Sequence, residues 1–79
     1  MPQLTLYHYE GCPYSERVCE FIRENKVTVL LKDIRQSPQA REELIKIGGK
    51  TQVPCLAIDG VPLYESRDII KWLRENGKK

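Results

Sequence analysis

Cys12 is the residue of this chain whose type and position are best suited to a chemical reaction. It follows Gly11 and precedes Pro13, between a segment of strand-forming residues, 4–7, and a stretch with helical periodicity. Proline is tolerated in the first turn of a helix, where its missing N–H would have no partner. The helix itself is indicated by apolar residues at helical spacing: Tyr14, Val18, Phe21 and Ile22. The sequence therefore predicts a cysteine at a helix N-terminus.

The chemistry that this position favours is that of a thiolate. A free thiol with a pKa near 8.5 is only about 3% ionised at pH 7, and the thiolate is the nucleophile. A helix N-terminus offers free N–H groups and a partial positive charge, which stabilise an anion. We expect Arg17, in the same first turns, to add to this field. A buried structural cysteine that only opens a helix is the alternative.

Composition bounds the class of protein. The 79 residues suit one small domain, 1–79, and 41% hydrophobic with 30% charged residues is ordinary for a soluble protein. A net charge of +2 does not favour nucleic acid, and no segment is long enough to cross a membrane. Three cysteines at these spacings fit no zinc module, so we expect no metal. Unpaired cysteines predict a reducing compartment, the cytoplasm, and we expect a monomer.

The middle of the chain continues the alternation of strand and helix. Residues 27–31 are β-branched and apolar, which predicts a second, largely buried strand. Ser37 is expected to cap a helix with Pro38 at its first position, and Gly48-Gly49 ends it. The inward face of this helix is predicted to carry Ala40, Leu44 and Ile47.

The last third of the chain predicts a hairpin and a closing helix. Asp59-Gly60 between residues 55–58 and 61–63 is a strong two-residue hairpin signal, and Pro62 should confine the last strand to a sheet edge. Ser66 is expected to cap the closing helix. Its inward residues are predicted to be Ile69, Ile70 and Leu73, with Trp72 at the margin. A right-handed parallel unit joined by an antiparallel hairpin gives a four-stranded mixed sheet with helices on both faces, an α/β fold.

Three separated segments resemble known families. Residues 11–15, 51–54 and 64–68 fall in the order and spacing of a glutaredoxin. The second and third segments also resemble the glutathione-binding N-terminal domain of glutathione transferases. The resemblance covers essentially the whole chain and implies a thioredoxin-like fold with the order βαβαββα.

The glutaredoxin resemblance implies a monothiol mechanism. The common dithiol motif ends in a second cysteine, where this chain has Ser15 after Pro13-Tyr14. Either this serine is the natural residue or it replaces a cysteine. Cys12 would attack the glutathione sulfur of a glutathionylated protein or small disulfide, and a second glutathione would regenerate the thiol. Glutathione is thus the implied co-substrate.

The resemblance also implies a set of glutathione contacts. Val53 would present its backbone to the cysteinyl part of glutathione, beside a cis bond to Pro54. Ser66 would meet the γ-glutamyl carboxylate, and Asp68 or Glu65 the α-amine. The glycine carboxylate would be met by basic or polar side chains near the proline, Lys50 and Gln52 first, with Arg35 as another candidate. Tyr9 departs from glutaredoxins, which commonly carry lysine there.

The other candidate residues receive lesser roles. Cys19 lies about 10 Å along the helix from Cys12, too far for an undistorted disulfide, and is interpreted as structural. Cys55 is interpreted as a core residue, with a regulatory thiol as the alternative. His8 ends the first strand near the site. Tyr14 is expected to border the glutathione groove rather than to react.

Two other functions stay open. In an iron–sulfur carrier, Cys12 and glutathione from two subunits would ligate one cluster, because thiolates are the natural ligands. In a transferase-like module, the chain would bind glutathione without reducing disulfides.

Overall fold

A mixed sheet with the strand order β2-β1-β3-β4 forms the centre of the computed structural model, which describes residues 3–77. The elements follow one another as β1 (Leu4–His8), α1 (Pro13–Asn25), β2 (Leu30–Asp33), α2 (Pro38–Gly48), β3 (Cys55–Ile58), β4 (Val61–Tyr64), α3 (Ser66–Trp72) and a final π-helical turn, η1 (Leu73–Gly77). β2 runs parallel to β1, and the other neighbours are antiparallel. The predicted α/β fold with the order βαβαββα is confirmed.

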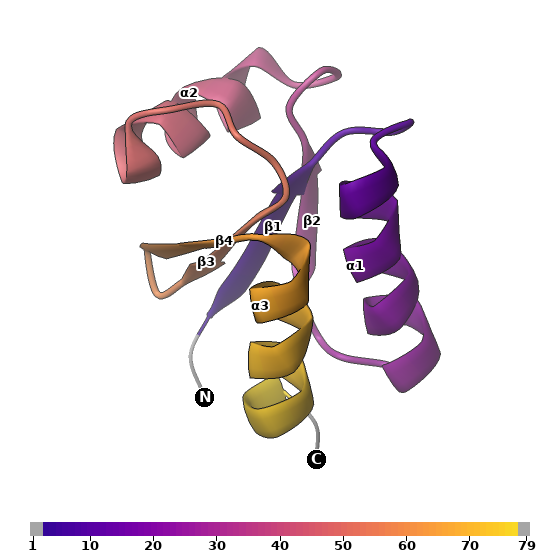
Figure 1. Ribbon diagram of the computed structural model, residues 1–79. Helices are drawn as coiled ribbons and strands as arrows, with labels where there is room; N and C mark the ends of the chain where they lie inside the picture. Colours follow the sequence, from indigo (N-terminus) through magenta and orange to yellow (C-terminus); the bar gives the residue numbers. More distant parts are fainter. Residues whose placement is uncertain (1–2, 78–79) are drawn as a thin grey trace.

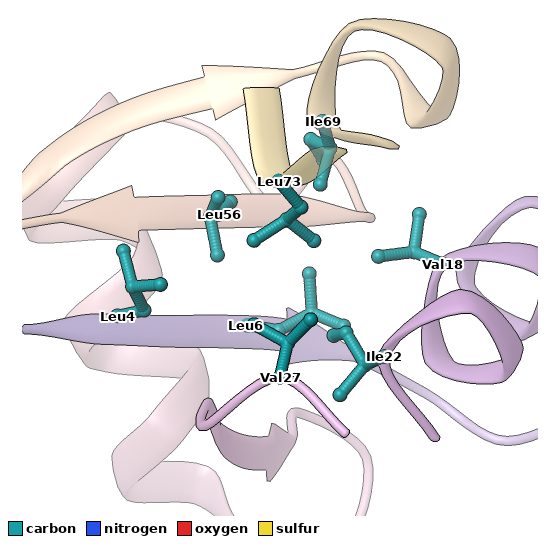
Figure 2. Close-up of a cluster of buried hydrophobic side chains, with 8 residues drawn as sticks. All are labelled: Leu4, Leu6, Val18, Ile22, Val27, Leu56, Ile69 and Leu73. Atoms are coloured by element: carbon teal, nitrogen blue, oxygen red, sulfur yellow. The ribbon is translucent and has the colours of Figure 1, made fainter. Parts of the chain in front are cut away.

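Alternation along the two central strands divides the core between the two faces of the sheet. Leu4, Leu6 and Leu56 pack against α1 and α3 on one face, the cluster drawn in Figure 2. Tyr7, Cys55 and Ala57 point the other way and pack against α2. Figure 1 shows α1 and α3 on one side of the sheet and α2 on the other, as the sequence predicts.

The second strand differs from its prediction. We expected a buried strand over residues 27–31, but β2 begins at Leu30, and the side chains of Leu30 and Leu31 are 51% and 46% exposed. The reason is the end of α1, where Lys26 is left-handed and the Val27 amide donates to the Ile22 carbonyl at 3.1 Å. This closing motif draws Val27 into the core beside Ile22 and leaves β2 a short edge strand.

Two local predictions are confirmed. The Ser37 hydroxyl accepts a hydrogen bond from the Ala40 amide at 3.2 Å and caps α2. Asp59 and Gly60 both have positive φ, 51° and 87°, as the tightest hairpin turn requires. Pro62 lies on the edge strand β4, where its missing donor breaks no ladder bond.

The start of α3 corrects another prediction. The capping residue is Glu65, with φ 71°, and no side chain caps the helix; Ser66 is the first helical residue. The Glu65 carbonyl accepts from the Ile69 amide at 2.9 Å, because the chain leaves β4 at Tyr64 and enters the helix within one residue. Ser66, 8% exposed, is therefore not used as a cap.

No helix among residues 3–77 has the length and apolar character needed to cross a bilayer.

Candidate functional site

Cys12 occupies the turn between β1 and α1, where it is the N-cap residue of the helix. Its carbonyl accepts from the Glu16 amide at 2.8 Å, and its own amide donates to the Tyr9 carbonyl at 3.4 Å. The side chain is only 7% exposed. The predicted position at a helix N-terminus is confirmed, since α1 begins at Pro13.

Two carboxylates fix this turn. The Glu16 carboxylate accepts from the Gly11 amide at 3.0 Å and so links the β1–α1 turn to the start of α1. The Asp33 carboxylate accepts from the Glu10 amide at 3.3 Å and also from the amides of Arg35 and Gln36, at 2.8 and 3.2 Å. Asp33 thus ties the β1–α1 turn to the β2–α2 loop, at the end of the sheet where the two parallel strands finish (Figure 1).

The Asp33 contacts predict a pH-dependent contribution to stability. Although burial acts in the opposite direction, the three amides and nearby His8 hold the pKa of Asp33 below its ordinary value. A carboxyl whose folded pKa is depressed stabilises the fold above its unfolded pKa, near 4, and this contribution is lost as the pH falls through the folded pKa. We expect Asp33→Asn to lower the free energy of unfolding by about 1 kcal/mol at pH 7.

The measurement is urea unfolding of both proteins at pH 7 and pH 2.5. The difference between wild type and Asp33→Asn should shrink at the lower pH, because protonation of Asp33 increasingly removes the charge that distinguishes it from asparagine. An equal difference at the two pH values would show that the carboxylate charge is not the cause.

Polar groups around the Cys12 sulfur hold the pKa of its thiol below that of an ordinary cysteine. Burial by itself raises its pKa, but the Ser15 hydroxyl, the amides of Ser15 and Tyr14, and the Tyr9 side chain together lower it further than burial raises it. The amide contribution is the expected effect of the helix N-terminus. Arg17, which we expected to add to the positive field, is not among the causes.

A groove of about 480 Å³ begins beside the cysteine turn. It is lined by Tyr14, Arg17, Gln52, Val53, Pro54, Glu65, Ser66 and Arg67. The bond between Val53 and Pro54 is cis, as the resemblance implied. The groove therefore brings together residues of all three sequence segments that carried the glutaredoxin resemblance.

Tyr14 illustrates how the site departs from simple helical periodicity. The sequence counts it among the apolar residues at helical spacing, but Tyr14 is 62% exposed, and Ser15 is buried on α1 together with Val18 and Ile22. Tyr14 borders the groove, as the site prediction expected.

Three other candidate residues do not line this groove. Lys50 places its ammonium nitrogen 4.4 Å from the centre of the Tyr64 ring, and Asp68 is an exposed residue of the first turn of α3. Arg35 lies over the Tyr9 ring, with its guanidinium carbon 4.0 Å from the ring centre. The contacts proposed between these side chains and glutathione stay predictions.

Arg17 and Arg67 are groove residues that we had not assigned to binding. The sequence feature that could have indicated them is a basic side chain within the first two turns of a helix that starts at one of the motif segments. The two arginines lie 50 positions apart in the chain, on α1 and α3, so only the fold shows that they share one groove.

The two remaining cysteines lie in different surroundings from Cys12, and none of the three is in a disulfide. Cys19 is half-buried on α1, and burial raises the pKa of its thiol. Cys55 is fully buried beneath α2, where burial likewise raises its pKa, and the core assignment is confirmed. Neither thiol is favoured as a nucleophile. Residues 3–77 contain no group of three His, Cys, Asp or Glu side chains that could hold a metal ion.

Comparison with solved structures defines the class of fold. A silkworm (Bombyx mori) glutathione S-transferase superposes with a TM-score of 0.83 at 24% identity, over 98% of this chain and 37% of that one. A thioredoxin-like protein gives 0.78 at 25% identity, over 92% of this chain and 97% of that one. A buckwheat glutaredoxin–glutathione complex gives 0.71 at 16% identity, over 96% and 72%. The fold is thioredoxin-like.

The family follows from the sequence itself. Residues 6–78 match the model of the glutathione S-transferase N-terminal domain, and the chain belongs to that family. It spans little more than a third of the silkworm transferase. No curated protein matches it.

Proposed function

We propose that this domain is a glutathione-dependent thiol–disulfide oxidoreductase that reduces glutathione mixed disulfides through Cys12. The observation that carries the proposal is the position of Cys12 at the start of α1, where its thiol pKa is lowered, beside a groove lined by the motif residues. A family member that bound glutathione only to conjugate it would use the glutathione thiol as its nucleophile and would need no acidic cysteine of its own. The Cys12 thiolate is thus the feature that favours disulfide chemistry.

The proposed reaction has two displacements. The Cys12 thiolate attacks the glutathione sulfur of a glutathionylated protein or small disulfide; the substrate sulfur leaves as a thiolate and takes a proton from solvent. A second glutathione thiolate then attacks the glutathione sulfur bound to Cys12, giving oxidised glutathione and the free thiolate. Ser15 occupies the place of a resolving cysteine, so the regeneration step takes a second glutathione. Glutathione is the co-substrate, and we propose that a monomer works in the cytoplasm.

The groove supports a specific placement of glutathione. Val53 lines the groove next to the cis bond to Pro54, and we propose that its backbone pairs with the peptide-like ligand as an added strand. Glu65 and Ser66 also line the groove; there Glu65 can accept from the α-amine, and Ser66 can donate to the adjacent carboxylate. Arg17 and Arg67 add two cations for the carboxylates of the tripeptide.

The decisive experiment is an intact mass measurement after incubation with oxidised glutathione, followed by peptide mapping. One glutathionyl adduct on Cys12, removed by reduced glutathione, is the expected result. An adduct absent from Cys12 would refute the proposal. Conjugation of glutathione to an aryl halide without any disulfide reduction would favour the transferase alternative, which the family match supports.

Ser66→Ala tests the ligand role of this serine apart from its structural role. Because Ser66 does not cap α3, its loss should leave the free energy of unfolding almost unchanged. The loss of one hydrogen bond to a carboxylate should raise the KM for glutathione about tenfold. Steady-state kinetics and urea unfolding measure the two effects.

Ser37→Ala is the matched control, since that serine does cap its helix. It should lower the free energy of unfolding by about 1 kcal/mol and leave the KM unchanged. An unchanged KM in Ser66→Ala would remove Ser66 from the site.

A further inference from the structure

A second groove, of about 840 Å³, also begins at the cysteine turn. It is lined by that turn, by α1 as far as Arg23, and by the end of β2. Arg17 lines both this groove and the one proposed for glutathione, so the two are neighbours at the start of α1. The reaction proposed above uses only the glutathione groove. The larger groove is therefore left without a role.

Carboxylates dominate the charge of this second groove. Four of its lining residues are acidic and two are arginines: Glu10, Glu16, Glu20 and Asp33, and Arg17 and Arg23. The one ion pair among residues 3–77 joins Lys32 to Glu43 of α2 instead. The four carboxylates therefore have no cationic partner in the described part of the chain. We call this surface the acidic groove.

The acidic groove also offers a free backbone edge. β2 lies at the edge of the sheet, and its Leu31 lines the groove with 46% of its surface exposed. The Ile34 amide donates to the His8 carbonyl of β1 at 2.8 Å. Because successive strand residues turn their backbone groups to alternate sides, the amide and carbonyl of Leu31 face away from β1. An extended peptide can pair with such an edge as an added strand.

The substrate of the proposed reaction has a part that this groove can hold. A glutathionylated protein brings a glutathione and a peptide segment to Cys12 together, and the segment needs a surface of its own beside the cysteine turn. Cysteines are oxidised and glutathionylated more readily when a neighbouring lysine or arginine favours their thiolate. A modified cysteine of this kind lies in a basic segment, and the charge of that segment is complementary to the acidic groove.

We propose that the acidic groove and the free edge of β2 bind the peptide part of a glutathionylated substrate, and that they favour lysine or arginine next to the modified cysteine. This inference rests on the proposed function and names its substrate class. The groove selects which mixed disulfides reach Cys12, and the two displacements stay as described above. The net charge of the chain, +2, acts in the opposite direction, because a general attraction favours acidic peptides. A preference for basic peptides therefore reports on a local acidic surface.

The first measurement compares the reduction of three glutathionylated peptides. They have equal length and carry lysine, serine or glutamate on both sides of the modified cysteine. Each kcat/KM is divided by that for the mixed disulfide of glutathione and 2-mercaptoethanol, which has no peptide part. At low ionic strength the lysine peptide should exceed the glutamate peptide about tenfold. The ratio should fall toward one at about 0.5 M salt, because salt screens charges at exposed surfaces.

Charge-neutralising variants then locate the preference. Glu10→Gln and Glu20→Gln are suitable because both residues are exposed groove residues, whereas Glu16 and Asp33 also hold the turn. Each substitution should reduce the ratio of the lysine peptide to the glutamate peptide about threefold. Glu24→Gln is the matched control, since Glu24 is an exposed acid of the same helix that does not line the groove. It should leave the ratio unchanged.

A second measurement follows binding without chemistry. The lysine peptide is made with serine in place of its modified cysteine and is titrated into ¹⁵N-labelled protein. The amide signals of Glu20 and Leu31, in the acidic groove, should shift. Glutathione alone should instead shift those of Gln52 and Ser66, in the neighbouring groove.

Equal rates with the three peptides would overturn the inference, as would the same change of ratio in Glu20→Gln and Glu24→Gln. A peptide that shifts no amide of the acidic groove would also overturn it. In each case, continued reduction of the small mixed disulfide would keep the proposed function. If no mixed disulfide is reduced but the peptide shifts the groove amides, the proposed function is refuted and the peptide-binding groove stands.

Discussion

Cys12→Ser should abolish glutathione-coupled disulfide reduction, with a loss of about a thousandfold or more. The proposed chemistry passes through a covalent bond to the Cys12 sulfur, and a serine hydroxyl without an activating base is not ionised near neutral pH. The fold should survive, because serine can keep the N-cap position that Cys12 holds. The measurement is the rate of reduction of a glutathionylated peptide with glutathione and an NADPH-coupled recycling system.

Cys19→Ser is the control for this result. Cys19 lies two turns further along α1, half-buried, with a pKa raised by burial, so its substitution should keep most of the activity. Residual turnover in Cys12→Ser comparable to wild type would refute the assignment of the nucleophile. Equal losses in Cys12→Ser and Cys19→Ser would point to a structural effect instead.

Gly48→Ala should destabilise the fold by about 2 kcal/mol, although alanine is the better helix former. Gly48 is the last residue of α2, and a methyl group there would overlap the hydroxyl oxygen of Tyr64 and lie 2.9 Å from its ring carbon Cζ. Among residues 3–77 the Tyr64 hydroxyl has no hydrogen-bond partner, and it is buried, so this oxygen has little room to move away. Urea unfolding at neutral pH measures the loss.

Tyr64→Phe supplies the test of the cause. Because the Tyr64 hydroxyl has no hydrogen-bond partner in the described part of the chain, its removal alone should be neutral or stabilising. Combined with Gly48→Ala, it should recover part of the loss, since the contact with Cζ remains. A double mutant whose free energies simply add would show that the hydroxyl is not what excludes a side chain at position 48.

Several elements were predictable because their signals are local. The Asp59-Gly60 turn needs two positive φ angles, which few residue pairs adopt without strain, and the hairpin forms there. Ser37-Pro38 starts α2 as expected, since a cap and a fixed φ act over only four residues. Pro62 correctly indicates an edge strand because the missing donor belongs to its own backbone.

The errors arose where the path of the chain between two elements outweighed the preference of single residues. Residues 27–29 have the composition of a strand, but the close of α1 carries Val27 into the core, and the strand pairs with β1 only from Leu30. Ser66 has the type of a capping residue, yet the short exit from β4 makes Glu65 the first residue of the turn and places Ser66 inside the helix. In both cases the path of the connecting segment set the residue at which the next strand or helix begins.

The amino-acid sequence by itself determined the order of the elements and the place of Cys12 at a helix N-terminus, because propensity, capping and turn geometry act over neighbouring residues. The tertiary structure decided which side chains surround that sulfur. It brought Ser66 and Arg67 to the groove beside Tyr14, tied the cysteine turn to Asp33, and buried the Ser15 hydroxyl with no partner among the residues that the structure describes. These are contacts between segments far apart in the chain, or the burial that such contacts create, and only the packing of the sheet and its helices sets them.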